Sequence, residues 1–99
     1  TRLDLGSNKI RVIEAGSFET LVKLVSLELH NNRLKSLHAN MFAGLNSLCE
    51  LDLRENKLTA LDPLTFAALP KLATLNLESN PLANTTVTLS FQGLTRIDI

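Results

Sequence analysis

The 99-residue chain has no tryptophan or tyrosine, only four phenylalanines, and a single cysteine. One cysteine excludes an internal disulfide framework and a zinc site built from several thiolates. Basic and acidic residues number ten each, so no excess of charge favours a nucleic acid or an anionic membrane as the general partner. No apolar run approaches the roughly 20 residues of a membrane span. We therefore expect no nucleic-acid partner and no direct membrane contact for this segment.

What the chain has in abundance is leucine, at 22 positions, in a pattern that returns every 24 residues. Self-similarity at such a fixed period indicates a stacked repeat architecture. The last unit departs from the period, because LTRIDI follows LATLNL after only 22 residues. The apolar columns of the repeat are Leu3, Leu27, Leu51 and Leu75; Leu5, Leu29, Leu53 and Leu77; Ile10, Leu34, Leu58 and Leu82; and Phe18, Phe42 and Phe66.

Three segments, LVSLELHNNRL, LCELDLRENKL and LATLNLESNPL, fit the pattern L-x-x-L-x-L-x-x-N-x-L without a mismatch. At these segments the chain resembles the leucine-rich repeat family. The 24-residue length, with F-x-x-L in the second half of the repeat, is similar to the type common in extracellular receptors and matrix proteins. The resemblance covers essentially the whole chain.

The resemblance implies an α/β solenoid, a curved horseshoe segment with a parallel sheet on its concave face. The convex return path, about ten residues long, suits turns, 3₁₀ pieces and irregular chain better than a full helix. Residues 1–99 would form a single segment of about four repeats, with an irregular 22-residue last repeat and no terminal caps. Strands are expected near residues 3–5, 27–29, 51–53, 75–77 and 97–99.

The missing caps suggest an interior slice of a longer ectodomain, because solenoids normally seal the cores of their terminal repeats. A self-contained short chain that stacks end to end with another copy is the alternative.

One asparagine follows each expected strand, where the chain turns and leaves backbone groups pointing inward. A side-chain amide offers a carbonyl and an NH₂ together, so it can satisfy both kinds of backbone group and link adjacent repeats. The sequence therefore predicts a structural ladder made of Asn8, Asn32, Asn56 and Asn80.

The outward strand positions form the concave surface in this family, and two of their columns are biased in charge. The middle column is acidic in four of five repeats, and the column after the asparagine is basic in three of four. The two stripes could bind a charged partner or form a solvated lattice of ion pairs of small net value. The lack of Trp and Tyr removes the usual anchors of interface hot spots. The binding candidates are Glu28, His30, Glu50, Asp52, Arg54, Asn76 and Glu78, and the basic column is Lys9, Arg33 and Lys57.

No catalytic signature occurs in the chain, which lacks G-x-S-x-G, H-E-x-x-H and any Gly-rich phosphate loop. The two histidines, His30 and His38, fall on different sides of the repeat. A metal bound by His30 with carboxylates would need two more fixed ligands that the sequence does not reveal. We therefore predict no enzyme, no cofactor and no metal site. A pH-sensitive contact at His30 is an alternative to an ordinary surface histidine.

By resemblance, the function expected is recognition of a protein ligand or co-receptor by an extracellular receptor or adhesion protein. Innate-immune, Toll-like and neuronal receptors belong to this type. A purely architectural scaffold, which forms homo- or heterodimers without its own ligand site, is the alternative. The single sequon, Asn84-Thr85-Thr86, predicts glycosylation at Asn84 and agrees with an extracellular location. An intracellular scaffold would require an unmodified Asn84.

Overall fold

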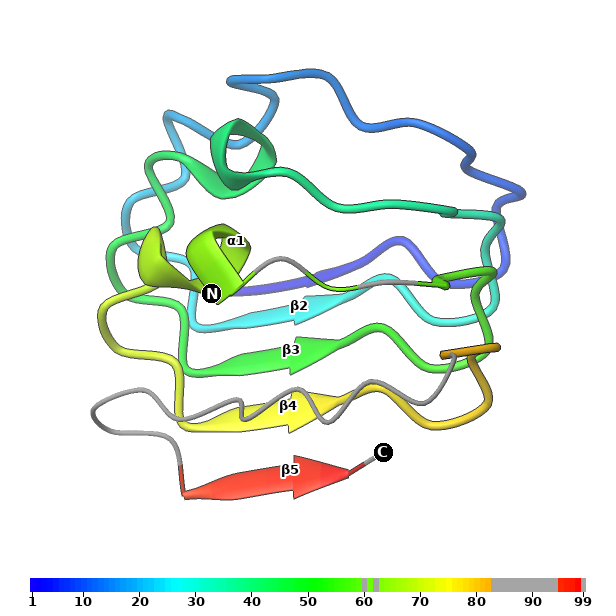
Figure 1. Ribbon diagram of the computed structural model, residues 1–99. Coiled ribbons are helices and arrows are strands. Elements are labelled where there is room, and N and C mark those ends of the chain that lie inside the picture. Colours follow the sequence, from blue (N-terminus) through cyan, green and yellow to red (C-terminus); the bar gives the residue numbers. More distant parts are fainter. Residues whose placement is uncertain (60, 62, 83–94, 99) are drawn as a thin grey trace.

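The computed structural model describes residues 1–59, 61, 63–82 and 95–98. Its described part contains five parallel strands that lie side by side in chain order on one side of a solenoid (Figure 1). This arrangement confirms the predicted fold class. Each strand begins one residue earlier than expected, so that its centre is the first leucine of the L-x-L pair or, in the last strand, Ile97. The strands are β1 (Arg2–Asp4), β2 (Ser26–Glu28), β3 (Glu50–Asp52), β4 (Thr74–Asn76) and β5 (Arg96–Asp98).

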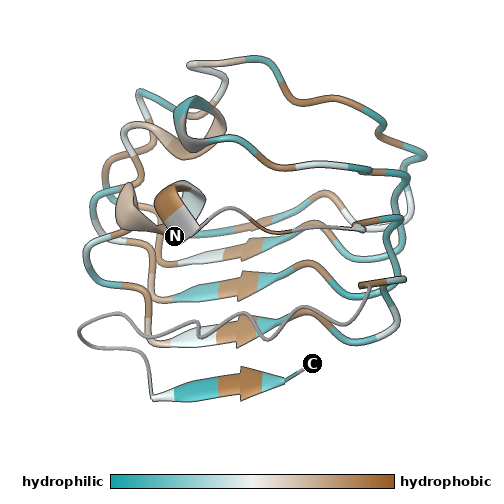
Figure 2. Cartoon of the chain, in the orientation of Figure 1, coloured by the Kyte–Doolittle hydropathy of each residue, from teal (hydrophilic) through white to brown (hydrophobic). Residues whose placement is uncertain are grey.

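The central residues of the strands are aligned across the whole sheet. Leu3 pairs with Leu27, Leu27 with Leu51, Leu51 with Leu75, and Leu75 with Ile97. Because side chains alternate along a strand, this register directs one residue of every strand into the core and its two neighbours outward. Figure 2 shows the result as a hydrophobic centre flanked by more hydrophilic residues in each strand.

The return path contains two short helical pieces on the side away from the sheet (Figure 1). The second repeat forms a 3₁₀ helix, η1 (Ala39–Phe42), and the third forms a single α-helical turn, α1 (Pro63–Ala67). Helix α1 begins at Pro63, where the missing backbone N–H removes no helical hydrogen bond. The corresponding part of the first repeat consists of turns.

The core lies between the sheet and this return path. The phenylalanine column is buried throughout, with Phe18, Phe42 and Phe66 exposed by 5, 0 and 1%. Burial is weaker at the two edges, because Leu3, Leu5 and Ile97 are only partly covered. Ile99 lies outside the described residues. Among those residues, no helix has the length and apolar character needed to cross a membrane.

Candidate functional site on the concave face

The asparagine ladder holds each repeat to the preceding one. The Nδ2 group of Asn56 donates to the carbonyl of Leu53 in its own repeat and to the carbonyl of Leu29 in the repeat before, each at 2.9 Å. Its Oδ1 accepts the N–H of Leu34 at 3.2 Å. Asn32 bonds in the same way: its Nδ2 donates to the carbonyls of Leu5 and Leu29, and its Oδ1 accepts the N–H groups of Asn8 and Ile10. The Nδ2 of Asn80 donates to the carbonyls of Leu53 and Leu77, and its Oδ1 accepts the N–H of Leu58.

Asn8, which lies between the first and second strands, differs from the other three in its hydrogen bonds. Its Nδ2 donates only within its own turn, to the carbonyls of Leu5 and Gly6. The ladder therefore fixes the outward columns of the sheet relative to one another most firmly at Asn32 and Asn56, which are 4 and 3% exposed.

A second set of polar contacts fixes the turn directly after three of the strands. The Oδ1 atoms of Asp4, Asp52 and Asn76 accept the backbone N–H two residues later, at 2.9, 3.1 and 3.0 Å. Only a short side chain with an oxygen at this position can close such a turn. Part of the acidic bias of the middle column is therefore structural, which the charge pattern alone did not indicate.

The hydrogen bond to Asp4 also affects its ionisation. The N–H of Gly6 holds the pKa of the Asp4 carboxyl below its usual range, because the bond favours the charged form. Partial desolvation opposes this shift and is the second-largest effect, and the nearby Glu28, His30 and Arg2 each lower the pKa of Asp4 by less.

The outward face of the sheet is hollowed into a depression of about 220 Å³ that extends from β2 to β5. Ser26, Thr74 and Asn76 give it neutral polar groups. The depression has a formal excess of three negative charges, because four carboxylates and one guanidinium line it. The carboxylates are those of Glu28, Glu50, Asp52 and Asp98, and the guanidinium is that of Arg96.

Ion pairs restrain some of these charged groups but not all of them. Arg54 Nε lies 3.1 Å from Asp52 Oδ2, and Arg96 Nε lies 3.1 Å from Asp98 Oδ2. At the first strand, Arg2 binds Glu28 at 2.6 Å, and Glu28 in turn raises the pKa of the Arg2 guanidinium. These pairs are partly exposed, so each contributes little to stability, but each holds a side chain in place on the sheet surface.

His30 lies in a tighter environment than a surface histidine. Its ring lies over Gly6, where a Cβ atom would overlap Nε2 and Cε1. Its Nδ1 is buried without a hydrogen bond, 3.7 Å from Asp52 Oδ2. The structure also brings His30, Asp4 and Glu28 together, with potential ligand atoms within 4.8 Å of one another. The sequence indicated Glu28 as a neighbour of His30 but did not reveal Asp4, and Arg2 already binds Glu28.

The structure places the concave-face candidates from the sequence on or directly beside the strands. Glu28, Asp52 and Asn76 occupy the last positions of β2, β3 and β4, and Glu50 begins β3. His30, Arg54 and Glu78 follow the same strands by two residues, beyond the strand ends. Asn84 lies outside the described residues. The basic column is not part of the depression, and its members Lys9, Arg33 and Lys57 line a different hollow.

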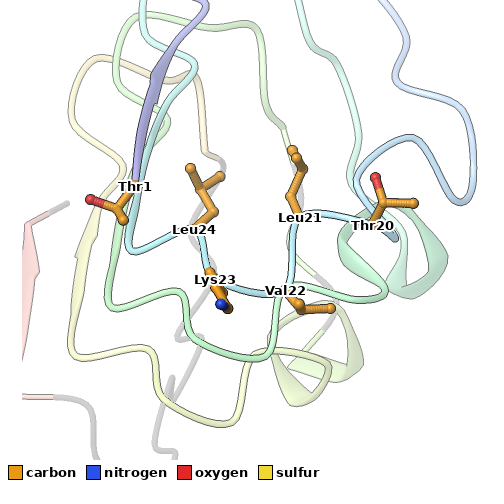
Figure 3. A pocket seen from close by; sticks show the side chains of 6 residues that line it. All are labelled: Thr1, Thr20, Leu21, Val22, Lys23 and Leu24. Atoms are coloured by element: carbon orange, nitrogen blue, oxygen red, sulfur yellow. The ribbon is translucent and has the colours of Figure 1, made fainter.

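An apolar cavity of about 300 Å³ lies near the N-terminus (Figure 3). The side chains of Leu21 and Leu24 point to the same side of the loop, whereas Lys23 points away from them (Figure 3). The cavity offers few polar groups to orient a ligand, and its lining residues are Thr1, Thr20, Leu21, Val22, Lys23 and Leu24. The concave face is the better candidate because it gathers charged side chains from several repeats.

Comparison with known protein families agrees with the repeat seen in the sequence and in the sheet. A family model described as leucine rich repeat matches residues 1–34 and 23–82. The chain belongs to the leucine-rich repeat family. Repeats of this family are generally protein-binding modules and typically act as non-enzymatic scaffolds for protein–protein interaction. No curated protein matches this leucine-rich repeat chain.

Proposed function

We propose that this leucine-rich repeat segment recognises a protein ligand or co-receptor through its concave face, as part of an extracellular receptor or adhesion protein. The observation that supports the proposal most is the acidic depression, which collects outward side chains from four strands into one surface. Its charge favours a partner that presents basic side chains, because complementary potentials steer encounter and exclude partners of the wrong sign.

Two carboxylates on this face are available to such a partner. Glu50 and Glu78 are exposed, and within the described part of the chain neither side chain has a hydrogen bond or an ion pair. Asp52 and Glu28 are already engaged by arginines, so their substitution would disturb the surface itself. Glu50 and Glu78 are therefore the residues on which binding can be tested without loss of structure.

The test compares two double variants with the same change in net charge. Glu50→Lys with Glu78→Lys alters the concave face, whereas Glu14→Lys with Glu19→Lys alters exposed positions of the return path. A partner captured from cell-surface protein by the native chain is titrated against both. We expect the concave-face variant to bind at least about tenfold more weakly and the control to bind like the native chain, because a like charge placed in an interface is costly. Equal affinities of the two variants would refute binding through this face.

The architectural alternative makes the opposite prediction in the same experiment. A scaffold that only dimerises would show self-association in sedimentation velocity, and that association would be unchanged in the concave-face variant. The exposed, unengaged carboxylates favour recognition over this alternative.

The extracellular location is tested separately at the sequon. We expect the native protein to carry an N-linked glycan at Asn84, detected by mass spectrometry and by a mobility shift that an N-glycosidase abolishes. Thr86→Ala removes the sequon and should abolish the shift without a change in Asn84 itself. An unmodified Asn84 in the protein isolated from its native source would favour the intracellular scaffold.

A further inference from the structure

A groove of basic residues lies beside the sheet, on the segments that follow the asparagine turns. It has a volume of about 940 Å³, and its lining residues are Arg11, Val12, Arg33, Lys35, Ser36, Lys57, Thr59 and Pro81. A neighbouring hollow of about 300 Å³ shares Arg33 and Lys57 and adds Lys9. We call this surface the basic groove and define it by Lys9, Arg11, Arg33, Lys35 and Lys57.

The sequence explains why these cations share one side. In each of the first two repeats a basic residue stands on either side of an inward apolar residue, in KIR and RLK. Because side chains of an extended chain alternate, an inward Leu34, which is 1% exposed, directs Arg33 and Lys35 outward. The sequence predicted the basic column but not a second row of basic residues, formed by Arg11 and Lys35. These two residues follow Lys9 and Arg33 by two positions, and this spacing is the pattern that indicates the second row.

Backbone hydrogen bonds keep the two rows in register from repeat to repeat. The N–H of Arg33 donates to the carbonyl of Ile10 at 2.7 Å, and the N–H of Lys57 donates to the carbonyl of Leu34 at 2.9 Å. Neighbouring segments of this kind lie about 5 Å apart, and residues two apart along an extended chain are separated by roughly 6.5 Å. The groove is thus a regular array of cations across three repeats.

These cations have no acidic partners within the described part of the chain. Its four ion pairs involve Arg2, His30, Arg54 and Arg96, all of them on or beside the concave face. The basic groove therefore holds five of the ten basic residues of a chain with zero net charge. Glu55 is the one carboxylate that lines it within the described ranges, and this residue belongs to the smaller hollow. A surface of this kind attracts a polyanion, because the polyanion releases its counterions when the cations replace them.

We propose that the basic groove binds a linear sulfated polysaccharide that lies across the repeats. Sulfate groups need only charge and hydrogen-bond donors, and the groove offers guanidinium and ammonium groups with the hydroxyls of Ser36 and Thr59. No aromatic residue lines it among the described residues, so a nucleic acid would lack the rings on which bases stack. An acidic peptide would lack an enclosed apolar anchor, since Val12 is 75% exposed. The inference shares the proposed extracellular location but does not depend on the concave face.

The experiment measures affinity for a heparin-derived dodecasaccharide by calorimetric titration at several salt concentrations. The variant Arg33→Ser with Lys35→Ser removes two charges from the groove. The control, Lys23→Ser with Lys71→Ser, removes two exposed lysines from other parts of the surface and leaves the same net charge. We expect the groove variant to bind at least about tenfold more weakly, with a smaller salt dependence, while the control stays within about twofold of the native chain. If the double variant does not fold, Lys35→Gln alone should weaken binding by roughly threefold.

Three outcomes would overturn the inference. The first is equal binding of a fully desulfated chain of the same length, because its carboxylates alone would then suffice. The second is tighter binding of a glutamate-rich peptide or a single-stranded oligonucleotide than of the sulfated chain. The third is an equal loss of affinity in the control variant. The concave-face variant should retain polysaccharide binding, so failure of the proposed protein recognition and failure of this inference are distinguished.

Discussion

Replacement of Asn56 by alanine is expected to lower the free energy of unfolding by about 3 kcal/mol. The amide is 3% exposed and serves backbone groups of two repeats. Without it, the buried N–H of Leu34 loses its acceptor, and the carbonyls of Leu29 and Leu53 each lose one of two donors. A buried backbone group left without its partner costs about 1–3 kcal/mol, so the sum is a large share of the stability of a small domain.

Urea unfolding followed by circular dichroism measures this change, with two matched controls. Asn46→Ala removes an exposed side-chain amide on the return path and should change stability by less than about 0.5 kcal/mol. Asn8→Ala should fall between the two, because the exposed Asn8 side chain donates only within its own turn. A loss at Asn56 no greater than at Asn46 would show that the ladder does not hold the repeats together.

Gly44→Ala should also destabilise the fold strongly, by about 3 kcal/mol. Gly44 has a φ of 94°, in a region that side chains disfavour by about 1–2 kcal/mol. A Cβ atom added there would overlap the Cα, carbonyl carbon and oxygen of Glu19 in the preceding repeat, so the backbone must shift. Overpacking of this kind adds typically 1–3 kcal/mol.

Gly16→Ala separates the two causes. Gly16 also has a positive φ, 80°, but a Cβ atom there would meet only the flexible side chain of Glu19, at 3.2 Å. Its loss should therefore reflect the backbone conformation alone, about 1–2 kcal/mol. Thermal melts of both variants give the comparison. Equal losses would mean that the contact between Gly44 and the backbone of Glu19 has no energetic consequence.

The period of the sequence was sufficient to predict the fold, because the inward residues repeat with almost no interruption. Leu27, Leu51 and Leu75 recur every 24 residues, and they occupy equivalent places at the centres of paired strands. The shorter last step still places Ile97 opposite Leu75. The predicted strands began one residue too far along the chain, because the motif marks the leucines rather than the residues that pair between strands.

Features that depend on geometry between repeats were not visible in the sequence. The residues before the ladder asparagines, such as Asn31 and Glu55, have φ values of 54° and 58°, yet no glycine marks this column. The closure of turns by Asp4 and Asp52 was hidden because their charge suggested a surface role instead. A pattern of residue types does not show which of several exposed oxygens faces a backbone N–H.

The separation of the acidic depression from the basic groove likewise could not be predicted from the sequence. The acidic and basic columns are only a few residues apart along each repeat, so an ionic lattice between them was a reasonable alternative. The turn at Asn32 and Asn56 instead directs the basic rows to the side of the solenoid, away from the acidic depression. The ion pairs form within the concave face, and the basic groove keeps its charges unpaired in the described residues.

Both surfaces depend on the asparagine ladder, because it holds the columns of successive repeats in register. The backbone amide of Leu34 reports on this register directly, because its N–H donates a hydrogen bond to Asn56 Oδ1 at 3.2 Å. Hydrogen exchange by NMR should find this amide protected in the native chain and less protected in Asn56→Ala. The amide of Leu58, which donates to Asn80 Oδ1 at 3.1 Å, should lose less. An unprotected Leu34 amide in the native chain would contradict the account. Equal losses of protection at Leu34 and Leu58 in Asn56→Ala would also contradict it, because they would show that Asn56 does not hydrogen-bond specifically to the preceding repeat.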